Sequence, residues 1–284
     1  MNHSDPNIEN QTPANTSDAD VTSLLSFVAK GSQLKAEKLL QKNPGLLLKT
    51  GDTVDFSGRA FNDVTAFQLS LWYKDAYMCK MILHNVPNDS TGEAIRVALI
   101  DQYKMLEEKG LTYTLDDTPH CDHCYDFTPL IDALRLYSER YDDWVAAGDW
   151  PEVEEHWCQE VGSLQREVPA HVAQEYCNPT RATDSHQRIL FHQEQLHRSF
   201  HLYNYRANEE MVWFPLKSDD TKGLGHDIGI LWEAGGGGRW AKRLSNGQDP
   251  GAADLAAMEA LDRVRTEDIR QLIEALMASV KPSD

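Results

Sequence analysis

The sequence lacks the long apolar runs from which membrane-spanning helices are built. No stretch of its 284 residues approaches about 18 consecutive apolar residues, so we expect no segment that crosses a bilayer. Residues 1–20 contain neither the basic segment nor the apolar run of a secretory signal. They are rich in Asn, Asp, Ser, Thr and Pro, a composition that buries too little apolar surface to offset the chain entropy lost on folding. The sequence therefore predicts a disordered tail over residues 1–20.

Positive charge is also scarce. The chain has 27 lysines and arginines against 45 aspartates and glutamates, which gives a formal net charge of −18. Such a chain repels nucleic acid and anionic bilayers unless a local basic patch compensates. The densest basic cluster, formed by Arg239, Lys242 and Arg243, is small. We therefore expect no nucleic-acid partner.

Cysteine is sparse, and its odd count disfavours a disulfide framework. The five cysteines are spread through the chain, whereas secreted disulfide-rich domains are small and carry dense, paired cysteines. The composition therefore predicts reduced thiols and a cytoplasmic protein.

Short amphipathic helices account for most of the first hundred residues. Apolar residues make up 41% of the chain, as in ordinary globular proteins. Residues 24–28 and 36–40 form two apolar helical faces separated by a Gly-Ser turn. A second pair follows over residues 65–72 and 78–82, at a spacing of roughly 30 to 40 residues that is typical of stacked helical repeats. Helices this short are marginal alone, so we expect them to pack side by side as paired hairpins.

Two segments, residues 24–48 and 55–83, resemble ankyrin repeats. In the second segment, residues 65–71 (Thr-Ala-Phe-Gln-Leu-Ser-Leu) are similar to the Thr-Pro-Leu-His-x-Ala helix of that family. The segment departs from the family because Ala66 replaces the proline, Gln68 replaces the histidine and extra residues precede the helix. The resemblance implies a stack whose turns and inner helices form a groove that binds other proteins.

The divergent form of these segments is similar to the ankyrin-like proteins of intracellular gamma-proteobacteria such as Legionella and Coxiella relatives. The resemblance depends on Asn43-Pro44-x-Leu46-Leu47, Trp72, Trp157-Cys158, Pro169-Ala170-His171-Val172 and Trp213-Phe214-Pro215-Leu216. Many such proteins are candidates for secretion into a host cell. The resemblance therefore implies an effector-type protein.

The rest of the chain is predicted to be mainly helical. Residues 111–125 have the composition of a loop, and two short apolar runs, Met211–Leu216 and Ile228–Trp232, favour a pair of strands. Helical spacing of apolar residues predicts helices over residues 128–147, 151–164 and 252–280.

The predicted fold class is therefore mainly α. Ankyrin-like stacked helical hairpins are expected over residues 21–110. A mainly helical C-terminal domain is expected over residues 111–284, with a small two-stranded β element near residues 210–233.

The sharpest candidate for a chemical site is the run His120-Cys121-Asp122-His123-Cys124. Imidazole and thiolate are good zinc ligands, and Cys-x-x-Cys spacing lets two sulfurs bind one ion. The candidate zinc ligands are His120, Cys121, His123 and Cys124. The alternative is a polar loop beside the next helix, because no second Cys pair lies at the usual distance and adjacent residues rarely bind the same ion.

Two further motifs have both a chemical and a structural interpretation. Glu194, His197 and His201 would share one helical face, as ligands do in the di-metal sites of helical bundles, but a solvated helix face explains them equally. The glycines of residues 235–238 lack the Gly-Lys-Ser/Thr ending of a phosphate-binding loop. They favour a flexible hairpin exit.

A cysteine nucleophile with a histidine base is another hypothesis. A thiolate needs a base or a positive field beside it, so the pair must meet in the folded chain. The candidate residues are Cys158 or Cys177 with His156, His171 or His186. The alternative is that these cysteines are buried and structural.

Taken together, these patterns favour a protein-interaction module or adaptor, possessing neither catalytic residues nor a cofactor. This hypothesis predicts an accessible surface along residues 30–130 that is rich in exposed aromatic or acidic side chains. Its partner is another protein. The alternatives are an enzyme with a Cys/His or metal centre in residues 120–230, and a protein stapled by zinc at residues 120–124.

Overall fold

Two antiparallel helices begin the described structure. Helix α1 (Asp18–Ala29) and helix α2 (Gln33–Lys42) pack against each other through apolar faces, as the sequence predicted. A short 3-10 helix, η1 (Pro44–Leu48), follows them. Most of the predicted disordered tail lies outside the described residues. The computed structural model describes residues 18–178, 182–183, 189–191, 198–204, 209–214, 237–238 and 250–280.

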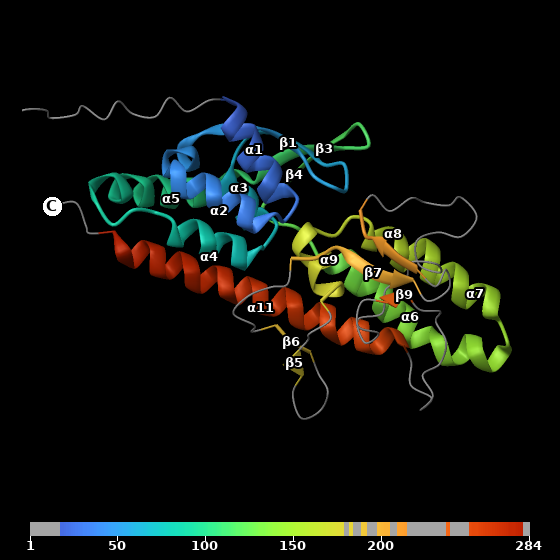
Figure 1. Ribbon diagram of the computed structural model, residues 1–284. Helices are drawn as coiled ribbons and strands as arrows, with labels where there is room; N and C mark the ends of the chain where they lie inside the picture. Colours follow the sequence, from blue (N-terminus) through green and yellow to red (C-terminus); the bar gives the residue numbers. More distant parts are fainter. Residues whose placement is uncertain are drawn as a thin grey trace, which may run out of the picture.

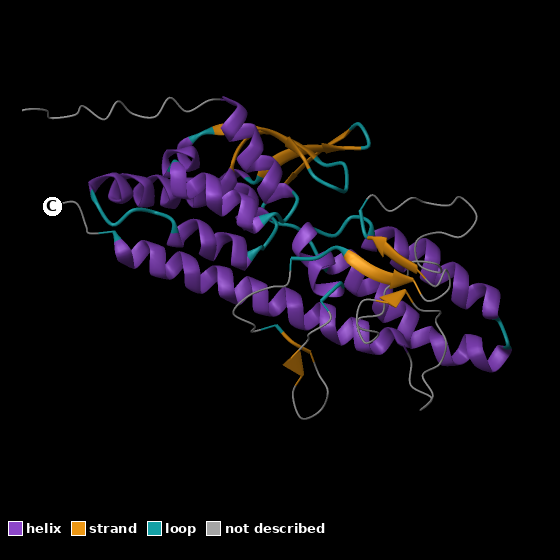
Figure 2. Cartoon of the chain, in the orientation of Figure 1, coloured by secondary structure: helices purple, strands orange, loops and turns teal. Residues whose placement is uncertain are grey.

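A four-stranded antiparallel sheet runs through the N-terminal half (Figures 1 and 2). Its neighbouring strands are β1 (Thr50–Val54), β2 (Ala60–Thr65), β3 (Leu111–Leu115) and β4 (Thr118–Asp122), in that order. The prediction of a mainly α protein built from ankyrin-like stacked hairpins is therefore wrong. Residues 111–125, predicted as a loop, supply two of the strands.

The turns between the strands explain why these segments pair. Asp116 and Asp117 connect β3 to β4 with φ angles of +48° and +59°. Two-residue hairpin turns require such positive angles, and aspartate tolerates them better than most residues. Between β1 and β2, one carboxylate oxygen of Asp55 accepts the backbone N–H groups of Ser57 and Arg59, each at 2.9 Å. Aspartate therefore shapes both hairpins, through its backbone conformation in one and its side chain in the other.

A buried polar chain of hydrogen bonds connects the sheet to the helices. Thr65 caps helix α3, and its side chain and that of Gln68 each accept a backbone N–H of the other residue. The Thr65 hydroxyl also donates to Gln102, whose amide donates to the Leu47 carbonyl at 2.9 Å. Every residue of α3 is buried, so this chain of bonds satisfies polar groups inside the core. The helices of this half are α3 (Ala66–Trp72), α4 (Ala76–His84) and α5 (Ser90–Lys109).

Helices dominate the second half, and one long helix joins it to the first. Helix α11 (Pro250–Ser279) packs on α6 and also against α4 and α5 (Figure 1). None of the helices in the described ranges has both the length and the apolar character needed to cross a membrane. The remaining helices are α6 (Thr128–Ala147), α7 (Trp150–Glu155), the π-helix η2 (His156–Val161), α8 (Gly162–Gln165) and α9 (Ala170–Tyr176).

Short strands lie beside these helices, but they do not pair in the way predicted near residues 210–233. Strand β8 (Glu209–Val212) pairs with the preceding β7 (His201–Asn204), which also pairs in parallel with β9 (Gly237–Gly238). The second predicted strand, residues 228–232, lies outside the described residues. A separate pair is formed by β5 (Ala182–Thr183) and β6 (Ile189–Leu190).

Alanine at Gly92 is expected to destabilise the protein, although alanine favours helices. Gly92 is buried in the first turn of α5, where a Cβ would overlap the carbonyl oxygen of Pro87. A backbone atom cannot move aside freely, so we expect Gly92→Ala to lower the free energy of unfolding by about 1–3 kcal/mol. Urea unfolding measures the change against Thr91→Ala, a substitution at the exposed neighbouring position. Equal stability of the two variants would contradict the close approach of Gly92 to the Pro87 carbonyl oxygen.

Candidate functional site

The first two predicted zinc ligands lie on strand β4. His120 and Cys121 are consecutive, so their side chains leave the strand on opposite faces. The His120 ring stacks on Tyr113, with 5.0 Å between ring centroids. The Cys121 sulfur lies 3.2 Å from the carbonyl oxygen of Lys109. The strand therefore separates the two side chains that were expected to bind one ion.

The other two predicted ligands follow the strand. His123 is exposed, whereas Cys124 is half-buried, and burial raises the pKa of its thiol despite the opposing charge of Lys74. A raised thiol pKa works against zinc binding, since the thiolate is the ligand. Across the part of the chain that the structure describes, no three His, Cys, Asp or Glu side chains are grouped to hold a metal ion. Zinc binding stays a prediction that metal analysis of the purified protein can test.

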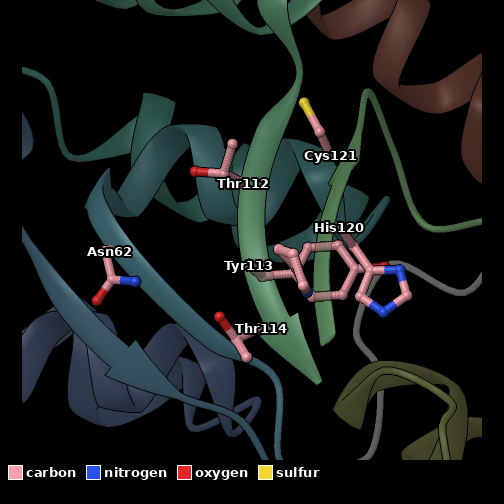
Figure 3. Close-up of a pocket in the computed structure, with 7 residues that line it drawn as sticks. Asn62, Thr112, Tyr113, Thr114, His120 and Cys121 are labelled. Atoms are coloured by element: carbon pink, nitrogen blue, oxygen red, sulfur yellow. The ribbon is translucent and has the colours of Figure 1, made fainter. Parts of the chain in front are cut away.

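A groove of about 400 Å³ lies against the same strands (Figure 3). The Tyr113 hydroxyl donates to a carboxylate oxygen of Asp122 at 2.8 Å, and burial together with Asp122 raises the pKa of Tyr113 to about 12. Figure 3 shows Cys121 pointing away from the Tyr113 and His120 rings, so the thiol and the imidazole do not form a nucleophile–base pair. The groove is lined by Asn62, Thr112, Tyr113, Thr114, Pro119, His120 and Cys121, and this lining includes no carboxylate.

The described members of the predicted Cys–His pairs lie on helix α9 and against aromatic rings. Cys177 and His171 are both buried at the ends of α9. The Nε2 of His171 lies 2.7 Å from the Tyr73 carbonyl oxygen, which can only accept, so this nitrogen carries the proton. His156 packs on the rings of Tyr137 and Trp144. The side chain of Cys158 and all of His186 lie outside the described residues.

Two other predicted motifs lie largely outside the described residues. Glu194 and His197 are not described, and His201 is exposed at the start of strand β7 rather than on a helix. Gly237 and Gly238 form strand β9, while residues 235–236 are not described. The helix expected to carry His201 is therefore wrong at that residue, which pairs with Val212 in a sheet, whereas the hairpin exit stays a prediction.

Helix α9 carries a buried polar centre that the sequence did not indicate. Besides His171, Gln174 donates through its amide to the Gly31 carbonyl oxygen at 3.0 Å. Glu175 accepts a hydrogen bond from Arg265 of α11 at 2.5 Å. The three α9 side chains thus contact the α1–α2 turn, the end of α3 and α11. This centre fixes elements that are far apart in the chain, because buried polar groups require partners.

A second buried ion pair borders the same centre. Asp75 caps helix α4 and accepts hydrogen bonds at 2.9 and 3.1 Å from the Arg198 guanidinium. Burial alone would raise the pKa of Asp75, but the charge of Arg198 and the proximity of His171 outweigh burial and hold that pKa well below its usual range. Arg198 also donates to Gln33 and Gln174. These charges are neutralised internally, so we assign them a structural role.

The end of the helical hairpin formed by α6 and α7 has a different character, because its charges are exposed. We call residues 139–155 the acidic tip; Figure 1 shows α7 and the end of α6 at one end of the molecule. Its exposed carboxylates are Glu139, Asp142, Asp143, Asp149, Glu152 and Glu155. The single basic residue of the tip is Arg140. Among the described residues, none of these carboxylates is in an ion pair.

Apolar side chains lie within the acidic tip. Gly148 ends α6 in a left-handed conformation with φ of +72°, and Asp149 then caps α7. This turn places Trp150 at the surface, where 48% of it is exposed. Trp144 and Val145 are half-buried beside the turn. Trp150 was not among the residues singled out from sequence patterns; its signal is the acidic run on both sides of it.

Comparison with known proteins identifies relatives. Residues 129–276 match the family described as CBUA0006 C-terminal domain, a span that includes the acidic tip, α9 and most of α11. The chain is 35% identical over 270 residues to the uncharacterized protein CBUA0006 of Coxiella burnetii, a match that covers 89% of this chain and 74% of the relative. The chain belongs to the CBUA0006 family.

Membership of the CBUA0006 family agrees with the resemblance to proteins of Coxiella relatives. The relative is itself uncharacterized, and neither match shows ankyrin repeats. No solved structure matches the chain.

Proposed function

We propose that this protein is an interaction module or adaptor that binds another protein through the acidic tip. The observation that supports the proposal is the exposed Trp150, which lies beside half-buried Trp144 and Val145 and is surrounded by carboxylates. Protein interfaces have this composition, with an aromatic or apolar centre and a polar rim. Tryptophan is also among the residues that most often dominate binding energy.

The tip is better suited to this role than the groove beside strand β4. The groove is lined mainly by small or uncharged side chains. Exposed acidic residues together with an exposed aromatic side chain occur at residues 139–155, beyond the stretch from 30 to 130 in which the sequence analysis expected them. The proposed contact surface therefore belongs to the part of the chain matched by the C-terminal family. Action in a host cell stays a prediction from the resemblance.

Replacing Trp150 with alanine is expected to weaken partner binding at least about tenfold, because a central tryptophan contributes about 2 kcal/mol or more. Partners are first identified by photo-crosslinking from position 147, an exposed alanine of the tip, in the full chain that keeps Trp150, and their affinity for the purified variants is then measured. Leu34→Ala is the matched control, since Leu34 is 70% exposed but lies on α2, outside the tip. Unchanged affinity of Trp150→Ala, or equal loss in both variants, would overturn the proposal.

A further inference from the structure

Three carboxylates of the acidic tip lie close enough together on one helix to repel one another. Glu139, Asp142 and Asp143 are exposed in the C-terminal part of α6, at offsets of three and four that place them on one face. Like charges at these offsets destabilise a helix, and the last turn of α6, which follows them, has no basic residue to balance them. Helix stability therefore does not explain these residues, whereas binding of an external cation would.

Trp150 adds a group that recognises organic cations. It follows the Gly148 turn directly, so its exposed ring lies next to the acidic end of α6. Lysine and arginine side chains bind over the face of a tryptophan ring and at the same time pair with nearby carboxylates. Asp149, which caps α7, and Glu152, in its first turn, supply such carboxylates close to Trp150 in the chain.

Charge complementarity selects the occupant of this surface. Nucleic acid and anionic bilayers are repelled by six exposed carboxylates opposed by one arginine. A second copy of the chain, with a net charge of −18, is repelled as well. We infer that the acidic tip docks a lysine- and arginine-rich segment of a partner protein, with one cationic side chain over Trp150. This inference rests on the proposed function and specifies its partner.

The test uses the purified full chain and a fluorescent peptide of alternating arginine and serine, with a glutamine-serine peptide of equal length as the neutral probe. Fluorescence anisotropy measures binding to the wild type and to two triple variants. The tip variant is Glu139→Gln, Asp142→Asn and Asp143→Asn. The control variant removes the same charge from the N-terminal half, by Glu108→Gln, Asp116→Asn and Asp117→Asn, which are exposed positions.

We expect the arginine peptide to bind the wild type and the control variant alike. The tip variant should bind it at least about tenfold more weakly, and raising the salt from about 0.05 to about 0.3 M should weaken wild-type binding by a similar factor. Absence of binding, equal loss in both triple variants, or equal binding of the neutral peptide would overturn the inference. If the tip variant keeps full affinity for a crosslinked partner that Trp150→Ala loses, the inference fails while the proposed function stands.

Discussion

Replacing Arg265 with methionine is expected to lower the free energy of unfolding by about 3–5 kcal/mol, because it removes one partner of a buried ion pair. Arg265 is fully buried in α11 and donates to Glu175 at 2.5 Å. Its guanidinium also lies 4.4 Å from the ring centroid of Tyr77 and donates to the Phe191 carbonyl oxygen. Methionine has a similar length but leaves the Glu175 carboxylate buried without its cation.

Arg270→Met is the matched control on the same helix. Arg270 is exposed and pairs with Glu267 and Glu274 at the surface. Exposed ion pairs contribute about 0–1 kcal/mol, so this variant should stay within about 1 kcal/mol of the wild type. Urea unfolding followed by circular dichroism measures the free energy of unfolding of both variants. Equal losses in the two variants would show that the contact between α9 and α11 does not depend on the Arg265 charge.

The second large effect is on the pH dependence of stability. Burial lowers the pKa of His171 to about 4, an effect that Asp75 opposes and Arg265 reinforces. In the unfolded chain this histidine should titrate near its ordinary value of 6.5. Between these two values the unfolded state binds more protons than the folded state. His171 therefore favours unfolding as the pH falls from 6.5 to 4, and the total loss of stability is about 3 kcal/mol.

His171→Gln is the variant that isolates this contribution. A glutamine amide can donate to the Tyr73 carbonyl oxygen as His171 does, but it does not titrate. We expect the wild type to lose about 2 kcal/mol more than the variant between pH 7 and pH 5. His84→Gln is the control, because His84 is exposed on α4 and should keep the wild-type slope. If the free energy of unfolding of the wild type and of His171→Gln changed in parallel with pH, the burial assigned to His171 would be contradicted.

The lowered pKa of Asp75 acts in a lower pH range. Its carboxylate is held ionised by Arg198, so it contributes stability above the ordinary aspartate pKa of 3.8 and loses it as the pH falls below that value. Measurements at pH 5 and above therefore separate the His171 effect from the Asp75 effect.

Helices could be predicted because their signals are local. The apolar faces of α1 and α2, the long stripe of α6 and the periodic residues of α11 each repeat at helical spacing within one segment. The strands could not be recognised in this way. β3 alternates over only five residues, and its turn is Asp116-Asp117, without the glycine that usually marks such hairpins.

The candidate site residues were also hard to predict from local sequence patterns. The sequence drew attention to His120 and Cys121 because they are adjacent, but strand geometry separates adjacent side chains. His171 and Glu175 attracted less notice, since their partners Tyr73 and Arg265 lie 98 and 90 residues away. The acidic run around Trp150 was visible in the sequence. The exposure of Trp150 at the end of a helical hairpin could not be seen there.

The positions of most helices and the strongly acidic character of the chain could be read from its residues alone, because both depend on residue type and short-range spacing. The pairing of β2 with β3 into one sheet, and the contacts of α9 with three distant elements, became visible in the folded chain. Strand pairing and buried ion pairs gain their free energy from contacts between segments remote in the chain. No local pattern specifies which segments will meet, so these features emerged only from the folded protein.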